Sequence, residues 1–504
     1  MPCVRPGVVF CGNSVIAQIV PDQTLGVENS VVTPNVDIKG VSSDRIDGGA
    51  IRGSGLFHSF QEFNVREGRG AYFSNPTGIE NIFSRVTGSN ASNIYGRLGV
   101  LGNANLFLLN PNGIIFGPNA SLDLNGSFLG STGNSFNFGD GKEFSATNPT
   151  ALPLLSVSVP LGVQFNQGQP SAIANFGNLS TSQNLTLLGG TVASTGQLSA
   201  AGQIAVAAVP GGSVVNLSST GQFQNIDTSS IKTGNSTSLA ELLTNIDERS
   251  RLGLTVNSNG QVELSSSGLP VVDGDLVANK VTAQSATLTA HNNLTLVDSQ
   301  IATTGDLNLL AGDTVRVRDS VANPFVAQAG GNLLVQGRQA VDIFALNNSS
   351  SGLLSGGNMV LRSANAVGGD AHYWTGGSFR IEQLDGSLGG LFSPYDPIIR
   401  AAEDVSFESY SGGSLHILAG GSVRIDSTVV ITGADGTNGL IEENVPLSDG
   451  TSISINGRNS STLDIRAGTT AFNPVANIPD PVPGIVNLRI DSVPTSANIT
   501  NRKH

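Results

Sequence analysis

Residues 329–337 read Ala-Gly-Gly-Asn-Leu-Leu-Val-Gln-Gly, and residues 419–425 read Ala-Gly-Gly-Ser-Val-Arg-Ile. In both stretches a glycine pair and a small polar residue precede a short run with aliphatic residues at every second position. This period of two places the aliphatic side chains on one face of a strand, and the glycine pair marks a turn. The sequence therefore predicts short half-buried strands separated by tight turns.

The same pattern recurs along much of the chain. In the second half, strands are predicted to begin at Leu294, Val315, Leu333, Met359, Phe379, Val405 and Val423, about 21 residues apart on average. Secondary strands are expected at Leu307, Val341 and Leu415, and two earlier runs, 184–187 and 203–206, lie 19 residues apart. A repeat of this length, built from two or three short strands, is typical of a β-solenoid.

One such repeat is too small to fold by itself. Ordering about 20 residues costs roughly 30 kcal/mol, whereas burying five or six aliphatic side chains contributes only about 10–15 kcal/mol. Neighbouring coils must therefore supply hydrogen-bonded ladders and a shared core. The alternative is a set of β-sandwiches with hairpins every 8–12 residues or so. We favour the solenoid because Asn-Gly and Asp-Gly pairs are not spaced as regular hairpin loops.

The composition of the chain argues against a nucleic-acid-binding protein, a protein with a membrane-spanning helix and a mainly helical protein. The chain of 504 residues has 25 Lys and Arg against 38 Asp and Glu, charged residues make up 12%, and glycines number 63. An acidic chain without a basic stripe is a poor nucleic-acid binder, so no nucleic-acid partner is expected. No apolar stretch reaches the roughly 18 residues that a membrane helix needs. So few charges also argue against a mainly helical surface.

The first 17 residues differ from the rest. Arg5 precedes the apolar residues 8–10, and Val15-Ile16-Ala17 fits a signal-peptide cleavage site, which would make Gln18 the mature start. The apolar stretch is short, so we interpret residues 1–17 as a truncated signal peptide, with a disordered tail as the alternative. The two cysteines, Cys3 and Cys11, fall inside it, which excludes a disulfide scaffold or a cysteine metal site farther along the chain.

Two similar tetrads stand out in the N-terminal part. Asn110-Pro111-Asn112-Gly113 joins two apolar runs, and Asn75-Pro76-Thr77-Gly78 lies 35 residues upstream. Pro111 presets φ, Asn112 tolerates turn geometry and Gly113 allows positive φ, so 110–113 is predicted to be a turn. The Asn110 side chain can close an Asx-turn onto the following backbone.

With these motifs, residues from about 18 to 170 resemble the secretion domain of two-partner secretion proteins, the filamentous-haemagglutinin N-terminal type, and look similar to related cyanobacterial proteins. The matching segments are Gly40 to Gly55, 57–60, 73–79 and 110–114. The family's second tetrad continues as Asn-Pro-Asn-Gly-Ile, as here, whereas Thr77 and Gly78 depart from its first tetrad, Asn-Pro-Asn-Leu. The resemblance implies a right-handed parallel β-helix with an N-terminal cap. It also implies export through an outer-membrane β-barrel transporter with periplasmic domains.

The segmentation expected from these patterns has five parts. A truncated signal peptide (1–17) precedes the secretion domain (18–170), a β-helix continuation (171–267), further β-helix repeats (268–436), and a loop with C-terminal strands and a Pro-rich linker (437–504). A helix is predicted over 238–247, with Ser238 as N-cap and Glu241 at capping-box spacing. Residues 437–452 are interpreted as a loop, and 477–484 as the linker.

The search for chemical sites predicts no cofactor and no metal. The histidines are scattered without ligand spacing, at His58, His291, His372, His416 and His504. The segment 433–439 resembles a calcium loop, but it occurs once and is interpreted as a turn.

The enzymatic alternative is a β-helical polysaccharide lyase or glycoside hydrolase, which would need clustered carboxylates or basic groups on one face. The candidates are Asp385, Asp396, Arg400, Glu403 and Asp404. Nearby Tyr373, Trp374 and Tyr395 make 370–410 the best candidate for a glycan contact, against the plainer interpretation that Tyr373 and Trp374 pack on the rod. Without catalytic spacing, we expect no enzyme. The sequence favours a secreted or cell-surface adhesin-like protein, monomeric, with surface glycans or host or matrix receptors as candidate ligands.

Overall fold

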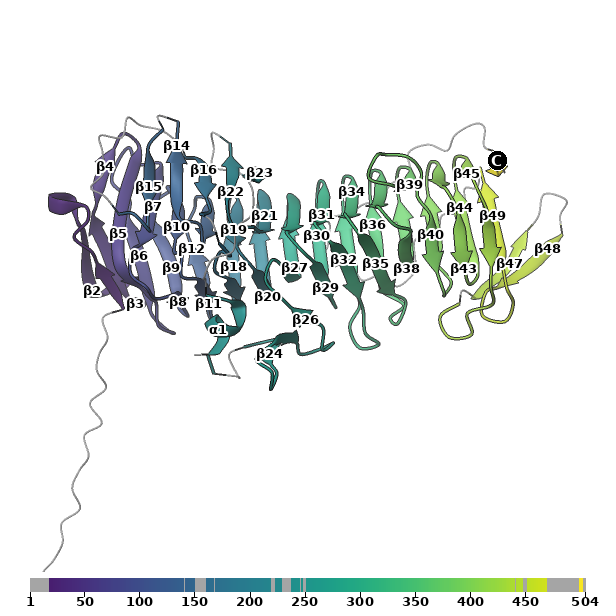
Figure 1. The fold of residues 1–504 in the computed structure, drawn as a ribbon, viewed down its shortest axis with the longest axis horizontal. Helices are drawn as coiled ribbons and strands as arrows, with labels where there is room; N and C mark the ends of the chain where they lie inside the picture. Colours follow the sequence, from purple (N-terminus) through teal and green to yellow (C-terminus); the bar gives the residue numbers. More distant parts are fainter. Residues whose placement is uncertain are drawn as a thin grey trace, which may run out of the picture.

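The chain winds into a long rod of stacked coils (Figure 1). The computed structural model describes residues 18–139, 141–149, 160–166, 168–218, 223–228, 237–244, 246–247, 251–439, 441–446, 451–468 and 498–501. The predicted signal peptide and the predicted Pro-rich linker lie outside these residues. Within them, no helix is long and apolar enough to cross a membrane.

One long side of the rod is a 16-stranded sheet. Strands β1 and β4 pair antiparallel with β5, and from β5 to β50 each strand pairs parallel with the next coil. The strands are β1 (Ile19–Pro21), β4 (Ala50–Arg52), β5 (Gly55–Phe63), β7 (Asn81–Val86), β10 (Asn105–Leu109), β13 (Phe128–Ser131), β19 (Leu185–Gly189), β21 (Gln203–Ala208), β28 (Ser285–Ala290), β31 (Leu307–Ala311), β34 (Leu333–Gly337), β37 (Met359–Ser363), β39 (Phe379–Glu382), β42 (Val405–Phe407), β45 (Val423–Ile425) and β50 (Ile499–Asn501).

A 24-stranded sheet supplies the remaining sides of the coils. Its strands are β2 (Ser30–Ile38), β3 (Val41–Gly48), β6 (Gly70–Ser74), β8 (Ser92–Ile94), β9 (Arg97–Leu101), β11 (Ile114–Phe116), β12 (Ser121–Asp123), β17 (Ile173–Asn175), β18 (Asn178–Thr181), β20 (Val192–Ala200), β27 (Leu276–Ala283), β29 (Leu294–Val297), β30 (Gln300–Thr303), β32 (Thr314–Arg318), β33 (Val326–Ala329), β35 (Ala340–Ala345), β36 (Gly352–Ser355), β38 (Val367–Thr375), β40 (Leu391–Ser393), β41 (Ile398–Ala401), β43 (Tyr410–Gly412), β44 (Leu415–Ala419), β46 (Val429–Ile431) and β49 (Leu463–Ala467).

These ladders confirm an all-β parallel β-helix and rule out the β-sandwich alternative. In the middle of the rod one coil runs through β31, β32 and β33, and the next begins at β34, where Leu333 pairs with Leu307. The inward-facing aliphatic side chains of successive coils form one continuous core along the rod, and most of them are fully buried. Few aromatics are needed there, because the interior between the sheets is narrow.

The predicted series of strands was partly wrong, because its members do not all occupy the same side of the coil. Leu294 and Val315 pair with each other in the 24-stranded sheet, where Val315 continues to Val341. Leu333 belongs to the other sheet, together with Met359. The sequence series therefore mixed two sides of the coil, because both sides use the same aliphatic alternation. The predicted 19-residue step is confirmed, since Leu185 pairs with Ile204.

Side-chain ladders at the turns join the coils. Asp306, Asn332, Asn358 and Ser378 occupy equivalent positions just before a strand of the 16-stranded sheet; we call them the turn ladder. Asp306 Oδ1 accepts the Asn332 amide (2.7 Å), Asn332 Oδ1 accepts the Asn358 amide (2.9 Å), and Asn358 Oδ1 accepts the Ser378 amide (2.8 Å). Each coil thus supplies an acceptor for a backbone donor of the coil that follows.

The turn ladder explains the glycines before Asn332, Asn358 and Ser378. A Cβ atom on Gly357 would stand 2.6 Å from Asn332 Oδ1 and 3.2 Å from a backbone carbonyl carbon. Any larger residue would push the ladder oxygen out of hydrogen-bonding position.

Three excursions leave the coils (Figure 1). The first is an antiparallel sheet of β14 (Ser135–Phe138), β15 (Glu143–Ser145), β16 (Pro160–Gln164), β22 (Ser213–Leu217) and β23 (Phe223–Thr228). The second holds helix α1 (Leu239–Thr244) and the strands β24 (Leu254–Val256), β25 (Val262–Leu264) and β26 (Pro270–Val271). The third is the hairpin of β47 (Ile441–Pro446) and β48 (Ser452–Asn456), so the loop predicted for 437–452 is wrong where these strands form.

The first excursion covers a stack of phenylalanines on the outside of the coils. Phe57, Phe83 and Phe107 occupy paired positions on β5, β7 and β10, with ring centroids 5.0 and 4.8 Å apart. Phe136 and Phe138 of β14 pack on their outer face. The burial of these rings is what fixes the antiparallel sheet on the rod.

The N-terminal end is closed by an antiparallel pair. Strand β2 pairs with β3, the register shifts between Thr33 and Val36, and Pro34 interrupts the outer edge of β2. His58 of β5 is fully buried next to this cap, where Ser30 Oγ lies 3.0 Å from its Nδ1. Burial lowers the pKa of His58 to about 3, and the nearby charge of Asp47 opposes this only in part.

We predict that Gly357→Ala destabilises the rod by about 1–3 kcal/mol, because the added methyl group displaces the Asn332 oxygen from the turn ladder. Denaturant unfolding followed by circular dichroism measures this difference. Gly436→Ala is the matched control, since a Cβ there meets no atom within 4 Å. Equal losses in both variants would contradict the role of the ladder.

His58 should make the folded state sensitive to acid. Its folded pKa lies below the unfolded value of 6.5, so the unfolded chain binds one more proton between these values and stability falls as pH drops from 6.5 towards 3. His58→Gln should make this decline shallower by about 1.4 kcal/mol per pH unit. Chemical unfolding at several pH values measures both slopes, and an unchanged slope in the variant would refute the assignment.

Candidate functional site

The Asn110–Gly113 turn is a corner of the coil, between β10 and β11. The Gly113 amide donates to the Asn110 carbonyl (3.2 Å), and Asn110 Oδ1 accepts the Asn112 amide at 2.9 Å, which is the predicted Asx-turn. Gly113 has φ +115°, a conformation that other residues rarely adopt. The turn predicted from the sequence is therefore confirmed. Asn110 closes the Asx-turn through its side chain, and Gly113 supplies the positive φ.

The same turn is bonded to the preceding coil. Asn110 is fully buried, and its Nδ2 donates to the Asn90 carbonyl (3.0 Å) and to Ser92 Oγ (2.9 Å). Asn112 Nδ2 donates to the Gly88 carbonyl at 2.8 Å. An amide satisfies these carbonyls and the turn at once, whereas a carboxylate could not donate to them. The upstream partners at 88–92 were missed in the sequence, because nothing in their pattern distinguishes them from an ordinary loop.

Helix α1 lies over this turn. A Cβ on Gly113 would stand 2.8 Å from Leu242 Cδ1, and it would also contact the Ala172 carbonyl and Ala91. The helix is capped as predicted, with Ser238 N donating to Glu241 Oε2 (2.9 Å) and Glu241 N donating to Ser238 Oγ (3.2 Å).

The Asn75–Gly78 turn is different in its surroundings. The Ile79 amide donates to the Pro76 carbonyl (3.1 Å) and Asn75 Nδ2 donates to the Ile79 carbonyl (3.2 Å), so it is also a closed turn. Pro76, Thr77 and Gly78 are exposed, and a Cβ on Gly78 would meet open space. The structure thus leaves the first tetrad uncovered and covers the second.

The predicted glycan contacts do not form a surface. Tyr373 is fully buried in the rod core with its ring 5.1 Å from that of Phe379, and Trp374 is only 4% exposed, packed with Val326 and Leu354. The proposal of glycan contact through Tyr373 and Trp374 is therefore wrong in this fold. On β38, these large side chains point into apolar environments because both sides of this segment are covered. Tyr395 is half-buried, against Phe344.

The candidate catalytic residues are not gathered at one place. Asp385 is exposed and holds the turn at Ser387, and Asp404 Oδ1 accepts the Ser422 amide in the manner of the turn ladder. Glu403 is exposed and accepts from Ser378 Oγ. Arg400 lies on β41, in register with Trp374. This arrangement provides no pair of carboxylates across an open cleft.

Asp396 instead belongs to a buried ionic cluster. His416 Nε2 lies 3.2 Å from Asp396 Oδ1, and its Nδ1 lies 3.5 Å from Asp464 Oδ2. Burial alone would lower the pKa of His416, but the two carboxylates outweigh it and raise the pKa to about 9. The charged imidazole ties β44 to β49 and to the loop before β41. His416 and Asp396 are fully buried and Asp464 is 8% exposed, so this cluster is suited to holding coils together.

The described residues contain no group of three or more His, Cys, Asp and Glu that could hold a metal ion. In the predicted turn at 433–439, Asp435 Oδ1 accepts the amides of Thr437 and Asn438, both at 3.0 Å. That segment therefore forms a turn in which backbone donors occupy Oδ1 of Asp435.

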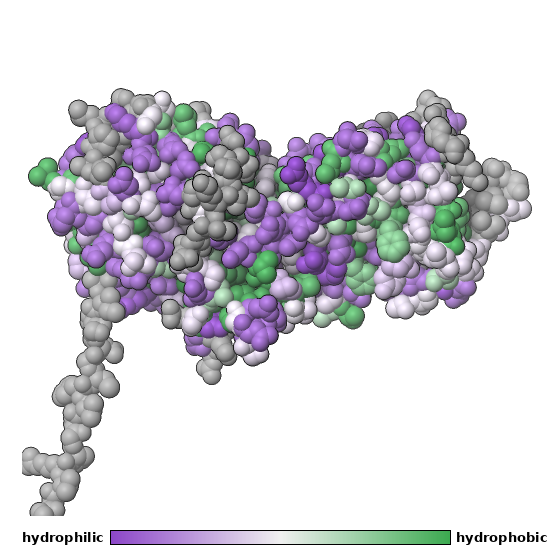
Figure 2. Space-filling model, in the orientation of Figure 1, coloured by the Kyte–Doolittle hydropathy of each residue, from purple (hydrophilic) through white to green (hydrophobic). Residues whose placement is uncertain are grey.

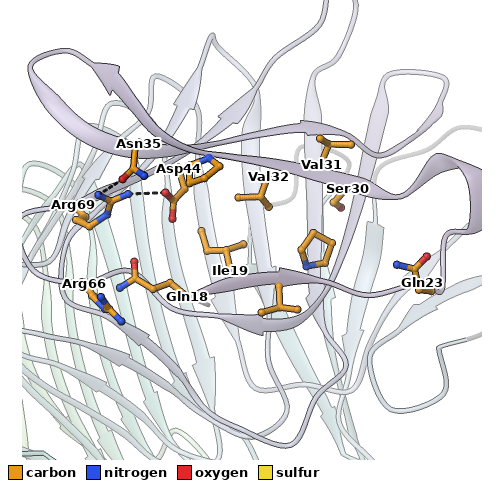
Figure 3. A pocket seen from close by; sticks show the side chains of 13 residues that line it. Gln18, Ile19, Gln23, Ser30, Val31, Val32, Asn35, Asp44, Arg66 and Arg69 are labelled. Carbon is orange, nitrogen blue, oxygen red and sulfur yellow. Dashed lines mark hydrogen bonds and ion pairs between the residues drawn. The ribbon is translucent and has the colours of Figure 1, made fainter. Parts of the chain in front are cut away.

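A hollow of about 720 Å³ lies at the capped end of the rod (Figure 3). Strand β1, with Ile19, and strand β2, with Val31 and Val32, border it on opposite sides. At one end Arg69 donates to Asp44 Oδ1 (2.7 Å) and Asn35 Oδ1 (2.9 Å). Aliphatic side chains line the middle of the hollow, and polar side chains lie at both ends, Arg66 and Arg69 at one and Gln23 at the other. No motif in the sequence pointed to it.

Arg85 is another residue that sequence reasoning missed. It is 1% exposed and donates to the Ser145 carbonyl (2.7 Å), Thr24 Oγ1 (2.9 Å) and Ser59 Oγ (2.9 Å). Burial lowers its pKa to about 10, against the opposing charge of Asp22. It fastens the cap and the first excursion to β5 and β7. An arginine inside a strand whose other residues are uncharged was the available signal.

Hydrophilic residues are spread over the face seen in Figure 2, and hydrophobic residues gather in several places, one of them beside the second excursion. The N-terminal half thus differs from the plain rod in three features: its cap, its covering excursions and its bonded turn.

One family model fits this division. Residues 17–264 match the family model described as the TPS secretion domain. Among solved structures, a filamentous hemagglutinin secretion domain is 14% identical, covers 80% of this chain and 99% of its own, and has a TM-score of 0.33. The HMW1 secretion domain from Haemophilus influenzae is 15% identical, covers 80% and 94%, and has a TM-score of 0.37.

Because both TM-scores are low, we assign no residue of this chain a position or a role from these two structures. A search of the curated proteins finds no match. The family match spans the cap, the Asn110–Gly113 turn, helix α1 and the strands β24 and β25. Residues 17–264 of this chain therefore form a secretion domain of the two-partner secretion family.

Proposed function

We propose that this chain is an exoprotein exported by a dedicated outer-membrane β-barrel transporter, whose periplasmic domains recognise its N-terminal secretion domain. The family match over residues 17–264 is the observation that carries the proposal. Within that domain, the Asn110–Gly113 turn combines an Asx-turn, a glycine at φ +115° and side-chain hydrogen bonds to the preceding coil. We assign it a role in recognition or in starting the first coils, with Asn75 and Pro76 as a second, exposed turn.

The coil structure suggests how export proceeds without a nucleotide. A single coil is unstable alone, so the chain can cross the membrane unfolded. Each coil that emerges adds a hydrogen-bonded ladder and buried aliphatic side chains to the one before, and this opposes backsliding. The absence of cysteine after Cys11 fits, because no disulfide can lock the chain before it crosses.

Outside the cell, we propose that the rod acts as an adhesin-like surface protein, either released or retained at the outer membrane. A rod of stacked coils presents a long outer surface with many polar residues, and much of that surface lies far from either end of the rod. Surface glycans and host or matrix receptors are the ligand classes to test. Buried Tyr373 and Trp374 are excluded from that test, and half-buried Tyr395 stays in it.

Asn110→Ala and Gly113→Val should each lower the amount of chain in the medium by about tenfold, the factor that corresponds to about 1.4 kcal/mol. The first removes two buried donor contacts and the second forces a β-branched residue to φ +115°. Immunoblots of medium and periplasm measure the distribution, and the missing material should accumulate in the periplasm.

Asn365→Ala is the matched control for this experiment. Asn365 also donates through its side-chain amide to a carbonyl of the preceding coil, that of Gln339 (2.8 Å), but it lies outside residues 17–264. Its secretion should equal that of the unaltered chain. Normal secretion of both turn variants would remove the turn from the export mechanism.

A further inference from the structure

The hollow at the capped end of the rod lies where the aliphatic core ends (Figure 3). Ile19 of β1 is part of that core, and the half-buried Val32 of β2 packs against it. Both side chains lie between the two strands that border the hollow. Its volume of about 720 Å³ falls within the range of about 300–1,000 Å³ that is usual for small-molecule pockets. The middle of the hollow is therefore an aliphatic surface large enough to hold a ligand.

One end of the hollow is cationic. Arg66 and Arg69 lie there, and Asp44 is the one carboxylate among the described lining residues, so the lining carries an excess positive charge. Arg69 is fixed in place, since it donates to Asp44 Oδ1 (2.7 Å) and Asn35 Oδ1 (2.9 Å). It also donates to Ser42 Oγ (2.9 Å). These bonds use three of the five guanidinium N–H groups, so two remain for a further acceptor.

An unused donor lies at the same end. Gln18 is beside Arg66 in Figure 3, and its Nε2 is a buried atom with no hydrogen-bond partner among the described residues. A buried donor that stays unpaired is destabilising, and an anionic oxygen would satisfy it with a charge-assisted hydrogen bond. We call Gln18, Arg66 and Arg69 the arginine end of the hollow.

The borders of the hollow are unsuited to a peptide strand. Pro21 ends β1 and Pro34 interrupts β2, and the strand registers shift beside both prolines. Strand addition needs a row of backbone donors along an edge, and proline supplies none. An alkyl chain needs no backbone donor, so the aliphatic middle favours an alkyl chain over a peptide.

We propose that the hollow binds a fatty acid, a free single-chain alkyl carboxylate, with its chain along the aliphatic middle and its carboxylate at the arginine end. The exposed Gln23 at the opposite end limits the length of chain that is covered. This binding site goes beyond export and adhesion, because it needs only the folded cap of the rod.

A free ligand fits these observations better than a membrane surface does. Apolar side chains that insert into a bilayer project outward from a protein, whereas Ile19 is only 6% exposed and Val32 is half-buried. The chain also carries a formal net charge of −13, which repels the anionic surface of a membrane. A single carboxylate close to Arg66 and Arg69 experiences their local positive charge instead.

The test titrates the folded full chain with alkyl carboxylates from hexanoate to tetradecanoate, by calorimetry and below their micelle concentrations. We expect one ligand per chain and a gain in affinity of about two- to fourfold for each added methylene, as partial or complete burial of that group gives. The gain should stop once the chain spans the aliphatic middle. Dodecyl maltoside and dodecyltrimethylammonium have the chain of dodecanoate without a carboxylate, and each should bind about fivefold more weakly.

Two variants locate the ligand. Arg66→Gln removes a charge from the arginine end and should weaken dodecanoate about fivefold without changing the binding of dodecyl maltoside. Val32→Thr places a hydroxyl in the aliphatic middle and should weaken both probes about fivefold. Arg45→Gln and Val36→Thr are the matched controls, because both residues lie on the β2–β3 pair and neither lines the hollow. Thermal unfolding checks that each variant is folded, and Val20→Thr, on β1, replaces Val32→Thr if that variant does not fold.

Several results would overturn the fatty-acid site. An affinity that keeps rising with chain length, or more than one ligand per chain, would show unspecific adsorption. Equal binding of dodecanoate and dodecyl maltoside would refute the role of the arginine end. Binding to vesicles of phosphatidylcholine and phosphatidylglycerol, without binding of free dodecanoate, would identify a membrane surface instead. None of these measurements depends on secretion, so the export proposal is tested separately.

Discussion

Everything in this rod depends on each coil being completed by the one before it. The turn ladder shows the dependence at atomic scale, since the oxygen of Asn332 satisfies a backbone donor 26 residues later, at Asn358. Gly331, Gly357 and Gly377 leave room for the ladder oxygens, and the aliphatic core continues past every coil boundary. Folding is therefore expected to proceed from the N-terminus to the C-terminus, because each folded coil presents hydrogen-bond acceptors to the backbone amides of the coil that follows.

The first coils need a template that no earlier coil supplies. The antiparallel pair of β2 and β3 provides it, with Ser30 on one side and His58 on the other. Arg85 then bonds the cap loop, the neighbouring strand and the first excursion together. The secretion domain is thus the part of the rod that carries its own starting surface. That is the property a chain would need if it begins to fold at its N-terminus while the rest is still crossing.

Sequence reasoning succeeded where the signal was local. The Asx-turn at Asn110 and the capping box of Ser238 and Glu241 each follow from residues within four positions of one another. It failed where the answer depended on which side of a coil a strand occupies. Val315 and Leu333 share one aliphatic alternation and yet lie in different sheets, and only the pairing between coils separates them.

The same limit applies to the aromatic pair on β38. Tyr373 and Trp374 were candidates for a glycan contact because acidic residues and Tyr395 lie near them in the sequence. Adjacent residues on a strand point to opposite faces, so one of the two would ordinarily meet solvent. Here both faces of the strand are covered, by the rod core on one side and by Val326 and Leu354 on the other. Nothing within a few residues of the pair reveals that cover, because the covering residues come from earlier coils.

Pro34 and the register shift beside it break the row of backbone donors and acceptors along the outermost ribbon of the molecule. A flat, uninterrupted edge strand could pair with the edge strand of another molecule, and repeated pairing of this kind would polymerise the rods into filaments. Because this edge strand is interrupted, the rod can be extended only at its opposite end, where the rest of the polypeptide adds further coils.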